Sequence, residues 1–171
     1  MVDIIRLDGP AARDAVPALT DVLIDCVEGG ASVSFMWPLA REKAEAFWHG
    51  VADGVARGDR VLLVARADGE IVGTVQMVFA GPENQPHRGD IAKMLVKRTA
   101  RRTGLGAALM DAAERAAREA GLTLLILDTT SGLAADRLYR RLGWVPFGEV
   151  PGHALMPDGA SSDTTFFYKA L

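Results

Sequence analysis

Hydrophobic and polar residues follow two different periods along the chain. Four segments repeat apolar residues every three or four positions, as one face of an α-helix does, and this predicts helices over residues 11–28, 39–57, 104–120 and 133–142. Short apolar runs predict strands over residues 4–7, 60–67, 70–79, 91–96, 123–128, 144–150 and 164–169. The predicted order is a strand, two helices, three strands, a helix, a strand, a helix and two strands.

Glycine and proline mark the turns between these elements. Asp8-Gly9-Pro10 predicts a turn after the first strand, and Asp68-Gly69 between two apolar runs predicts a β-hairpin. Loops are expected over residues 31–38, 81–89 and 151–159. We therefore expect one α/β domain of the α+β kind over the whole chain, residues 1–171, with a single mixed sheet of about six to seven strands flanked by about four helices.

Composition excludes several classes of protein. The net charge of −3 at pH 7 argues against nucleic-acid binding, and no run approaches the roughly 18 apolar residues of a membrane helix. Cys26 is the only cysteine, which leaves no internal disulfide and no thiolate metal site; its place on an apolar stripe predicts a core position. The three histidines lack the spacing of metal ligands, so no metal is expected. Without a secretory signal, we expect a cytoplasmic protein with neither a nucleic-acid nor a membrane partner.

Residues 91–120 combine a strand, a basic turn with glycines and an amphipathic helix. Backbone N–H groups at a helix N-terminus have no partner within the helix and lie at the positive end of its dipole. Gly104 and Gly106 let the backbone approach a bulky phosphate closely. The strand and turn also hold a run of cations without acids: Lys93, Lys97, Arg98, Arg101 and Arg102. The segment predicts a site for a phosphorylated cofactor.

Two other kinds of phosphate site fit the sequence less well. A nucleoside-triphosphate P-loop requires Gly-Lys-Ser/Thr, and no such pair follows these glycines. A dinucleotide site is closer, because Gly104-Leu105-Gly106 begins a Gly-x-Gly-x-x-Gly pattern and Asp128 ends the next strand, where a ribose-binding acid would lie. However, Leu109 occupies the third glycine position, and seven residues separate Val96 from Gly104 where that motif needs a tight turn.

A third interpretation comes from a family resemblance. The segment Arg101-Arg102-Thr103-Gly104-Leu105-Gly106 resembles the Arg/Gln-x-x-Gly-x-Gly/Ala motif of the GCN5-related N-acetyltransferases (GNAT). The segment from Leu138-Tyr139 to Gly143-Trp144 is similar to that family's LYxxxGF signature, and the two motifs have a family-like separation. The resemblance covers essentially the whole chain. It implies the GNAT fold, acetyl-CoA as co-substrate, a small-molecule amine as acceptor and a possible homodimer.

The resemblance also implies which residues contact acetyl-CoA. Backbone groups of one strand end would pair with the pantetheine amides, and an N–H there would donate to the thioester oxygen. Amides and cations of the following turn would hold the pyrophosphate. The family often has Asn seven residues before the tyrosine; this chain has Gly132 there, and Asp136 is expected to replace part of that contact. The predicted cofactor residues are Met94, Leu95, Val96, Arg101, Arg102, Thr103, Gly104, Leu105, Gly106, Ala107, Asp136 and Tyr139.

Two residues are candidates for the chemistry of acetyl transfer. The resemblance places the Tyr139 hydroxyl near the sulfur, where a phenol would act as the acid for the leaving thiolate; the alternative is a core aromatic residue. Asp128 at the end of its strand would bind the substrate ammonium and take its proton, through a raised pKa or a water relay. The alternative for Asp128 is a cap of the turn over residues 128–131.

The acceptor site has a narrower resemblance. The segments 29–36, 148–152 and 157–159 look like the tabtoxin-resistance branch of the family, whose members acetylate a β-lactam amino-acid toxin. Glu28, Ser32, Phe35 and Trp37 are the predicted substrate-binding residues, although solvation of Glu28 and core packing of Phe35 and Trp37 are equally plain interpretations. An amino acid, an aminoglycoside or a polyamine is an alternative acceptor, and a non-catalytic acyl-CoA-binding or regulatory module is an alternative function.

Overall fold

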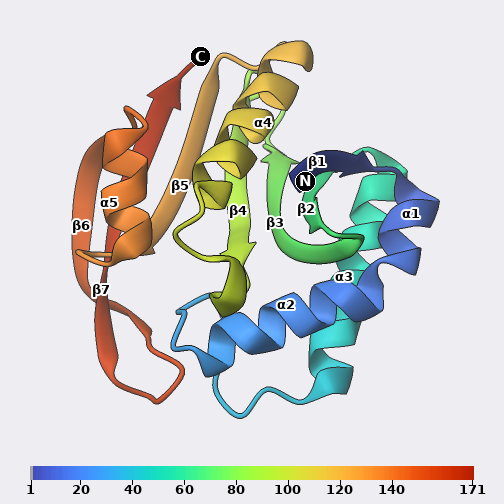
Figure 1. Cartoon of the computed structure of the whole chain (residues 1–171). Coiled ribbons are helices and arrows are strands. Elements are labelled where there is room, and N and C mark those ends of the chain that lie inside the picture. Colours follow the sequence, from blue (N-terminus) through green and yellow to red (C-terminus); the bar gives the residue numbers. More distant parts are fainter. Residues whose placement is uncertain (1) are drawn as a thin grey trace.

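One seven-stranded sheet forms the centre of the computed structural model, which describes residues 2–171 (Figure 1). The strand order is β1-β2-β3-β4-β5-β7-β6, and only β4 and β5 are parallel neighbours. The strands are β1 Val2–Leu7, β2 Arg60–Ala67, β3 Glu70–Phe79, β4 Arg88–Val96, β5 Leu124–Thr130, β6 Val145–Leu155 and β7 Ser161–Ala170. The helices are α1 Gly9–Asp14, α2 Val16–Glu28, α3 Arg41–Arg57, α4 Leu105–Glu119 and α5 Ala134–Arg141, with a short 3₁₀ turn η1 Arg98–Ala100.

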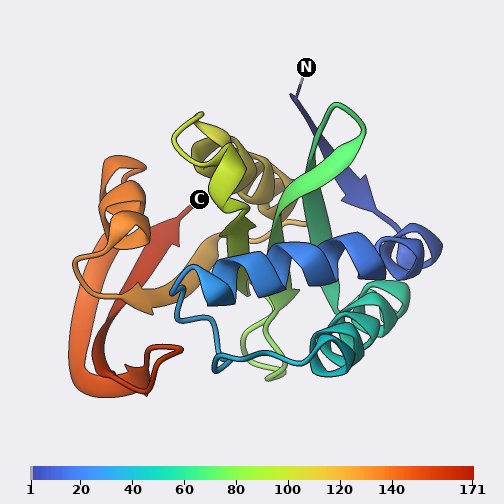
Figure 2. The same cartoon turned by 60° about the horizontal axis from the view of Figure 1, so that its bottom comes forward.

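Helices cover both faces of the sheet, and each face has its own core. Helices α1, α2 and α3 pack on one face and lie in front of the sheet in Figure 2, while α4 and Tyr139 of α5 pack on the other. Strand β2 is buried on both faces, with Leu62 and Val64 toward the first and Val61 and Leu63 toward the second. A strand that is covered on both faces has a continuous run of apolar residues, and this run predicted β2 from the sequence.

Strands β4 and β5 are hydrogen-bonded neighbours only at their beginnings. Their register pairs residues 88–90 with residues 124–126, and the ladder ends there. Beyond this point β4 keeps only β3 as a strand neighbour, whereas β5 continues with β7 on its other side (Figure 1). The backbone groups of β4 that face β5 are therefore left without strand partners in the second half of β4.

A β-bulge interrupts β4 in the same region. Gln76 of β3 pairs with Ala92 and Thr74 pairs with Leu95, so that Lys93 and Met94 together stand opposite one residue. Lys93 has a φ of 49°, which is the left-handed region that non-glycine residues seldom adopt. The bulge also exchanges the two faces: Ile91 packs in the α4-side core, and Leu95 packs in the α2-side core.

The predicted helix over residues 11–28 is wrong in one respect, because two helices occupy this segment. Asp8 caps α1 by accepting a hydrogen bond from the Ala11 N–H, so Gly9 and Pro10 begin a helix in place of the predicted turn. Helix α1 ends at Asp14, Ala15 links the two helices, and Pro17 lies in the first turn of α2. Proline has no N–H to continue a helix but is well tolerated at a helix start, which explains both the break and the new beginning.

The predicted loop over residues 151–159 is also wrong, since β6 continues to Leu155. A second register shift between Val150 and Ala154 absorbs Pro151 and Gly152 within the strand. Strand β6 is an edge strand, so the missing N–H of a proline there breaks no ladder. The remaining predicted elements are confirmed with ends displaced by at most three residues, β2 and β3 match at both ends, and the Asp68-Gly69 hairpin is confirmed by the pairing of β2 with β3.

Candidate functional site

The turn before α4 and the first turn of this helix present unpaired backbone N–H groups. Gly104 is the N-cap with a φ of 86°, and no side chain caps the helix. The first intrahelical bond runs from the Ala108 N–H to the Gly104 carbonyl. The N–H groups of Leu105, Gly106 and Ala107 precede it, so the helix supplies no acceptor for them. This arrangement is the anion cradle that the sequence predicts.

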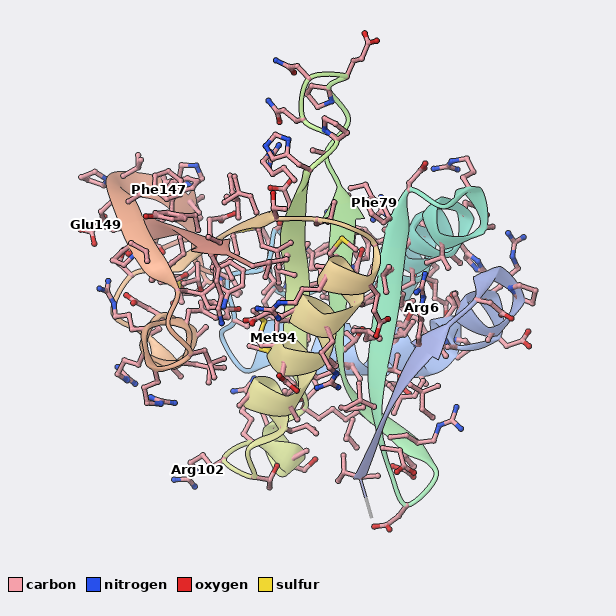
Figure 3. The ribbon with its side chains drawn as sticks, turned by 90° about the horizontal axis from the view of Figure 1, so that it is seen from above. Arg6, Phe79, Met94, Arg102, Phe147 and Glu149 are labelled. Carbon is pink, nitrogen blue, oxygen red and sulfur yellow. The ribbon has the colours of Figure 1, made fainter. Side chains whose placement is uncertain are left out.

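The two glycines of the cradle serve different purposes. A Cβ at Gly104 would meet no heavy atom within 4 Å, so only its left-handed backbone requires glycine. A Cβ at Gly106 would lie 3.1 Å from Leu138 Cδ2 and 3.7 Å from Met94 Sδ. Gly106 therefore lets three elements, α4, α5 and the bulge of β4, approach one another closely, and Met94 is seen beside α4 in Figure 3.

In the predicted basic turn, some side chains hydrogen-bond to the backbone and others extend into solvent. Arg101 points inward, since its Nε donates to the Val96 carbonyl at 3.1 Å and its Nη2 lies 3.9 Å from Cys26 Sγ. The Thr103 hydroxyl donates to the Ala100 carbonyl at 2.8 Å. Arg102 is exposed and extends outward from the turn (Figure 3). All three residues are exposed, but the Arg101 and Thr103 side chains bond to nearby backbone carbonyls, whereas Arg102 extends away from the turn.

Tyr139 and Asp128 lie on the two elements beyond the point where β4 and β5 separate. Tyr139 is 5% exposed, and its ring packs against Trp144 and Phe167 at centroid distances of 6.2 and 6.0 Å. Burial, together with the negative charge of Asp128, raises the pKa of the Tyr139 hydroxyl above its ordinary value. The ring thus belongs to the core, and its hydroxyl is close enough to Asp128 to experience its charge.

Asp128 lies within β5 and not at its end, contrary to the prediction. The strand continues to Thr130, and Asp128 stands opposite Phe166 of β7. The alternative of a cap over residues 128–131 is therefore wrong, because two of these residues follow Asp128 within the strand. Asp128 is exposed. Its carboxylate acts electrostatically on Tyr139 of α5 and on Lys93 of β4, which places the three side chains around one region.

Asp136 is occupied within α5. It is 3% exposed; its Oδ2 accepts from the Gly132 N–H at 2.6 Å, and its Oδ1 accepts from Arg140 Nε at 2.5 Å. Burial alone would raise the pKa of Asp136, but these two hydrogen bonds outweigh it and leave the pKa below its ordinary value. Asp136 thus ties the Gly132 N–H to the start of α5, and its contact with the pantetheine arm stays a prediction.

Glu28 connects the end of α2 to the turn that follows β4. Arg98 Nη2 donates to Glu28 Oε2 at 2.5 Å, while Arg98 Nε and its backbone N–H donate to Asp25 at 2.9 and 2.7 Å. Burial alone would raise the pKa of Asp25, but the hydrogen bonds from Arg98 outweigh it. The pKa of Asp25 therefore lies below its ordinary value. A substrate ammonium at Glu28 would have to compete with this ion pair.

The loop between α2 and α3 is joined to the β6–β7 hairpin. The Ser32 hydroxyl donates to the Leu155 carbonyl at 2.8 Å, and the Trp37 N–H donates to the Pro157 carbonyl at 3.0 Å. The two segments lie side by side in Figures 1 and 2. The Trp37 side chain is 44% exposed, whereas Phe35 packs edge-on against Phe47 of α3 at 5.3 Å. The α2–α3 loop and the β6–β7 hairpin thus form one rim.

Lys93 is a residue that the sequence showed only as part of a basic patch. Its Nζ donates to Ser34 Oγ at 3.2 Å and lies 5.5 Å from the centre of the Phe47 ring. The bulge in β4 turns this side chain toward the α2–α3 loop and away from the turn that precedes α4. No spacing rule for a regular strand would have revealed it, because the bulge breaks the alternation.

Residues 2–171 contain neither a metal-ligand cluster nor a membrane-spanning helix. Within that range no group of three or more His, Cys, Asp and Glu side chains is arranged to hold a metal ion. None of the helices described there has the length and apolar character needed to cross a membrane. Cys26 is buried and free, as predicted from its apolar stripe.

Comparisons with known proteins agree with this fold. An N-acetyltransferase from the hisH–hisA intergenic region of Azospirillum brasilense is 36% identical over 112 residues, which are 64% of this chain and 65% of that relative, just under two thirds of its length. A GNAT acetyltransferase from Streptococcus pneumoniae superposes with a TM-score of 0.80 at 22% identity over 100% of both chains. The yncA structure from Salmonella typhimurium, determined with its cofactor acetyl-CoA, gives 0.82 at 18% identity over 100% of this chain and 94% of that one.

The family profile covers the parts of the chain that build the site. The match to the Acetyltransferase (GNAT) family extends over residues 19–144, from α2 to the residue before β6. It includes the bulged strand β4, the cradle at α4 and Tyr139 on α5. The fold, with its single mixed sheet, agrees with this match. This chain belongs to the Acetyltransferase (GNAT) family.

Proposed function

We propose that this chain transfers the acetyl group of acetyl-CoA directly to the amine of a small molecule. The observation that supports this most is the early end of the β4–β5 ladder beside the cradle at α4. A pantetheine arm can hydrogen-bond to the exposed edge of Met94, Leu95 and Val96 as an added strand would. The N–H groups before Ala108, with Arg102, then receive the pyrophosphate.

Asp128 and Tyr139 are proposed to handle the two protons of the reaction. Asp128 holds the ammonium and takes up one of its protons, directly or through water, which frees the nitrogen lone pair to bond to the acyl carbon. The second N–H proton, lost as the amide forms, passes to the departing thiolate or to solvent. As the carbon–sulfur bond breaks, the Tyr139 hydroxyl donates a hydrogen bond to the departing thiolate. Because the pKa of Tyr139 is raised, the phenol stays protonated; it is a hydrogen-bond donor rather than a strong acid.

A β-lactam amino-acid toxin is the acceptor that we propose first. The support is the joined rim, because the loops that resemble the tabtoxin-resistance branch contact each other through Ser32–Leu155 and Trp37–Pro157. Trp37 on that rim is half-exposed and suited to cover a ligand. Other amino acids, aminoglycosides and polyamines are the competing acceptors.

The test is release of free thiol from acetyl-CoA by the purified chain with a panel of these amines. We expect thiol release that depends on the amine, and tighter binding of CoA than of NAD in a parallel titration. If acetyl-CoA binds and no amine releases thiol, the chain is an acyl-CoA-binding module. If NAD binds and CoA does not, the dinucleotide interpretation replaces this one.

Substitution of Gly106 tests where acetyl-CoA binds. Gly106→Val places a side chain against Leu138 and Met94, and overpacking of this kind costs about 1–3 kcal/mol, so we expect roughly tenfold weaker binding of acetyl-CoA. Titration by calorimetry measures the affinity. Gly121→Ala is the matched control: at the far end of α4 it adds a methyl group in open space at a φ of 79°, and we expect a loss of about 1 kcal/mol in stability from the left-handed backbone with unchanged affinity. Unchanged affinity in a folded Gly106→Val variant would contradict the proposed cofactor site.

A further inference from the structure

Lys93 is held in an unusual backbone conformation at the centre of the site. Its φ of 49° places it among the four non-glycine residues with positive φ within residues 2–171, and it is the one of these four that lies within a strand. Such a conformation costs about 1–2 kcal/mol for an L-residue. The bulge that requires it re-aims one side chain, and bulges of this kind are common next to active sites.

The surroundings of Lys93 leave its charge without an ionic partner. The side chain is half-buried, its Nζ lies over the Phe47 ring and its hydrogen bond goes to the neutral hydroxyl of Ser34. Among residues 2–171 no carboxylate forms a salt bridge with it. Burial lowers the pKa of Lys93, and the charge of Asp128 opposes this only in part. A half-buried cation of this kind is stabilised by an anion, which a ligand could supply.

The positions of the charged side chains indicate which charges that ligand carries and at which end. Asp128 on β5 supplies a negative charge near Tyr139, and Lys93 with Ser34 supplies a positive charge and a hydroxyl on the side of the α2–α3 loop. The same loop is joined to the β6–β7 hairpin through Ser32. A molecule with an ammonium at one end and a carboxylate at the other complements both charges at once.

We propose that Lys93 and Ser34 form an anion subsite that selects acceptors with a carboxylate beside the amine to be acetylated. This inference rests on the proposed acetyl transfer and specifies its substrate class as amino acids and their analogues. The carboxylate binds to Lys93 Nζ and the Ser34 hydroxyl, and the ammonium binds to Asp128. Polyamines and aminoglycosides, which bring further positive charge toward Lys93, are disfavoured.

The experiment compares L-amino acids with their own amides as acceptors, with thiol release as the readout. The wild-type chain should show a kcat/KM roughly tenfold or more higher for the acids, as expected for a charge-assisted hydrogen bond. Lys93→Met should remove this preference by raising KM for the acids with kcat nearly unchanged, and should leave the amides almost unaffected. Ser34→Ala should weaken the preference in the same direction to a smaller extent.

Lys43→Met is the matched control. Lys43 Nζ also lies over an aromatic ring, 5.9 Å from the centre of Phe35, and Phe35 packs against the Phe47 ring that Lys93 contacts. The Lys43→Met variant should keep the wild-type preference. Equal use of acids and amides by the wild-type chain, or a full preference in Lys93→Met, would overturn the anion subsite. If Lys93→Met does not fold, the ratio of kcat/KM for acids to that for amides, measured in the wild-type chain and in Ser34→Ala, tests the anion subsite. Absence of thiol release with every amine would instead overturn the proposed acetyl transfer itself.

Discussion

Replacement of Tyr139 by Phe should lower kcat for acetyl transfer by about 100-fold, the contribution typical of a positioned hydrogen-bond donor to charge that develops in the transition state. The hydroxyl is lost, while the ring keeps its contacts with Trp144 and Phe167. Because the removed interaction is made to the departing sulfur, the affinity for acetyl-CoA should change by no more than a few-fold. Stopped-flow or steady-state thiol release, with calorimetry for binding, measures the two quantities separately.

Tyr168→Phe provides the control, since Tyr168 is the only other tyrosine and lies on β7 with its ring beside Phe147. Its kcat should equal that of the wild type. The raised pKa of Tyr139 adds a further expectation: ionisation of this phenol should not reduce the rate until the pH exceeds the ordinary value of 10.0. A Tyr139→Phe variant with wild-type kcat would return Tyr139 to the role of a core aromatic residue.

Asp128→Asn should reduce kcat/KM for the amine by roughly 100-fold, because it removes both the charge that holds the ammonium and the proton acceptor. The amide keeps nearly the same size and one hydrogen-bond acceptor, and Asp128 is exposed, so the fold should tolerate it. Initial rates at varied amine concentration, with acetyl-CoA saturating, give the value. The loss should be largest at pH values where the amine is mostly protonated.

Asp111→Asn on the exposed side of α4 makes the same change in net charge away from the site, and its rates should match the wild type. Asp128→Asn is also expected to affect Lys93, because the carboxylate that supports the charged lysine is gone. Loss of preference for acids together with loss of rate would therefore be consistent with one shared region. An Asp128→Asn variant as active as the Asp111→Asn control would exclude Asp128 from the reaction.

Local patterns along the chain were sufficient for most of the elements and for the cradle. The apolar runs of β2 and β3 follow directly from burial of these strands on both faces of the sheet. The glycines of the cradle could be recognised because their reason is local: a left-handed backbone at Gly104 and a close approach at Gly106. The two wrong boundaries both involve proline, whose effect depends on whether its position needs an N–H.

The roles of individual charged residues could not be obtained in the same way. Glu28 and Asp136 look alike in the sequence as free acids near the site, yet Arg98 and Arg140 occupy them in the structure. Arg101 and Arg102 are adjacent, and one points inward to Val96 while the other points outward. The Glu28–Arg98 pairing depends on which elements meet in space, because the two residues are 70 positions apart in the sequence. The Asp136–Arg140 pairing is an i,i+4 contact within α5, which helical spacing alone could have indicated.

The sequence by itself determined the order of most elements and the place of the unpaired N–H groups at the start of α4, because both depend on backbone conformation and on periodic burial. Only the tertiary structure decided what surrounds the acceptor. The bulge at Lys93, the separation of β4 from β5, and the joining of the α2–α3 loop to the β6–β7 hairpin are properties of strand pairing between distant segments. They turn the basic patch into two sites: a cradle for phosphate at α4, and, as we propose, a cation for the carboxylate of the acceptor at Lys93.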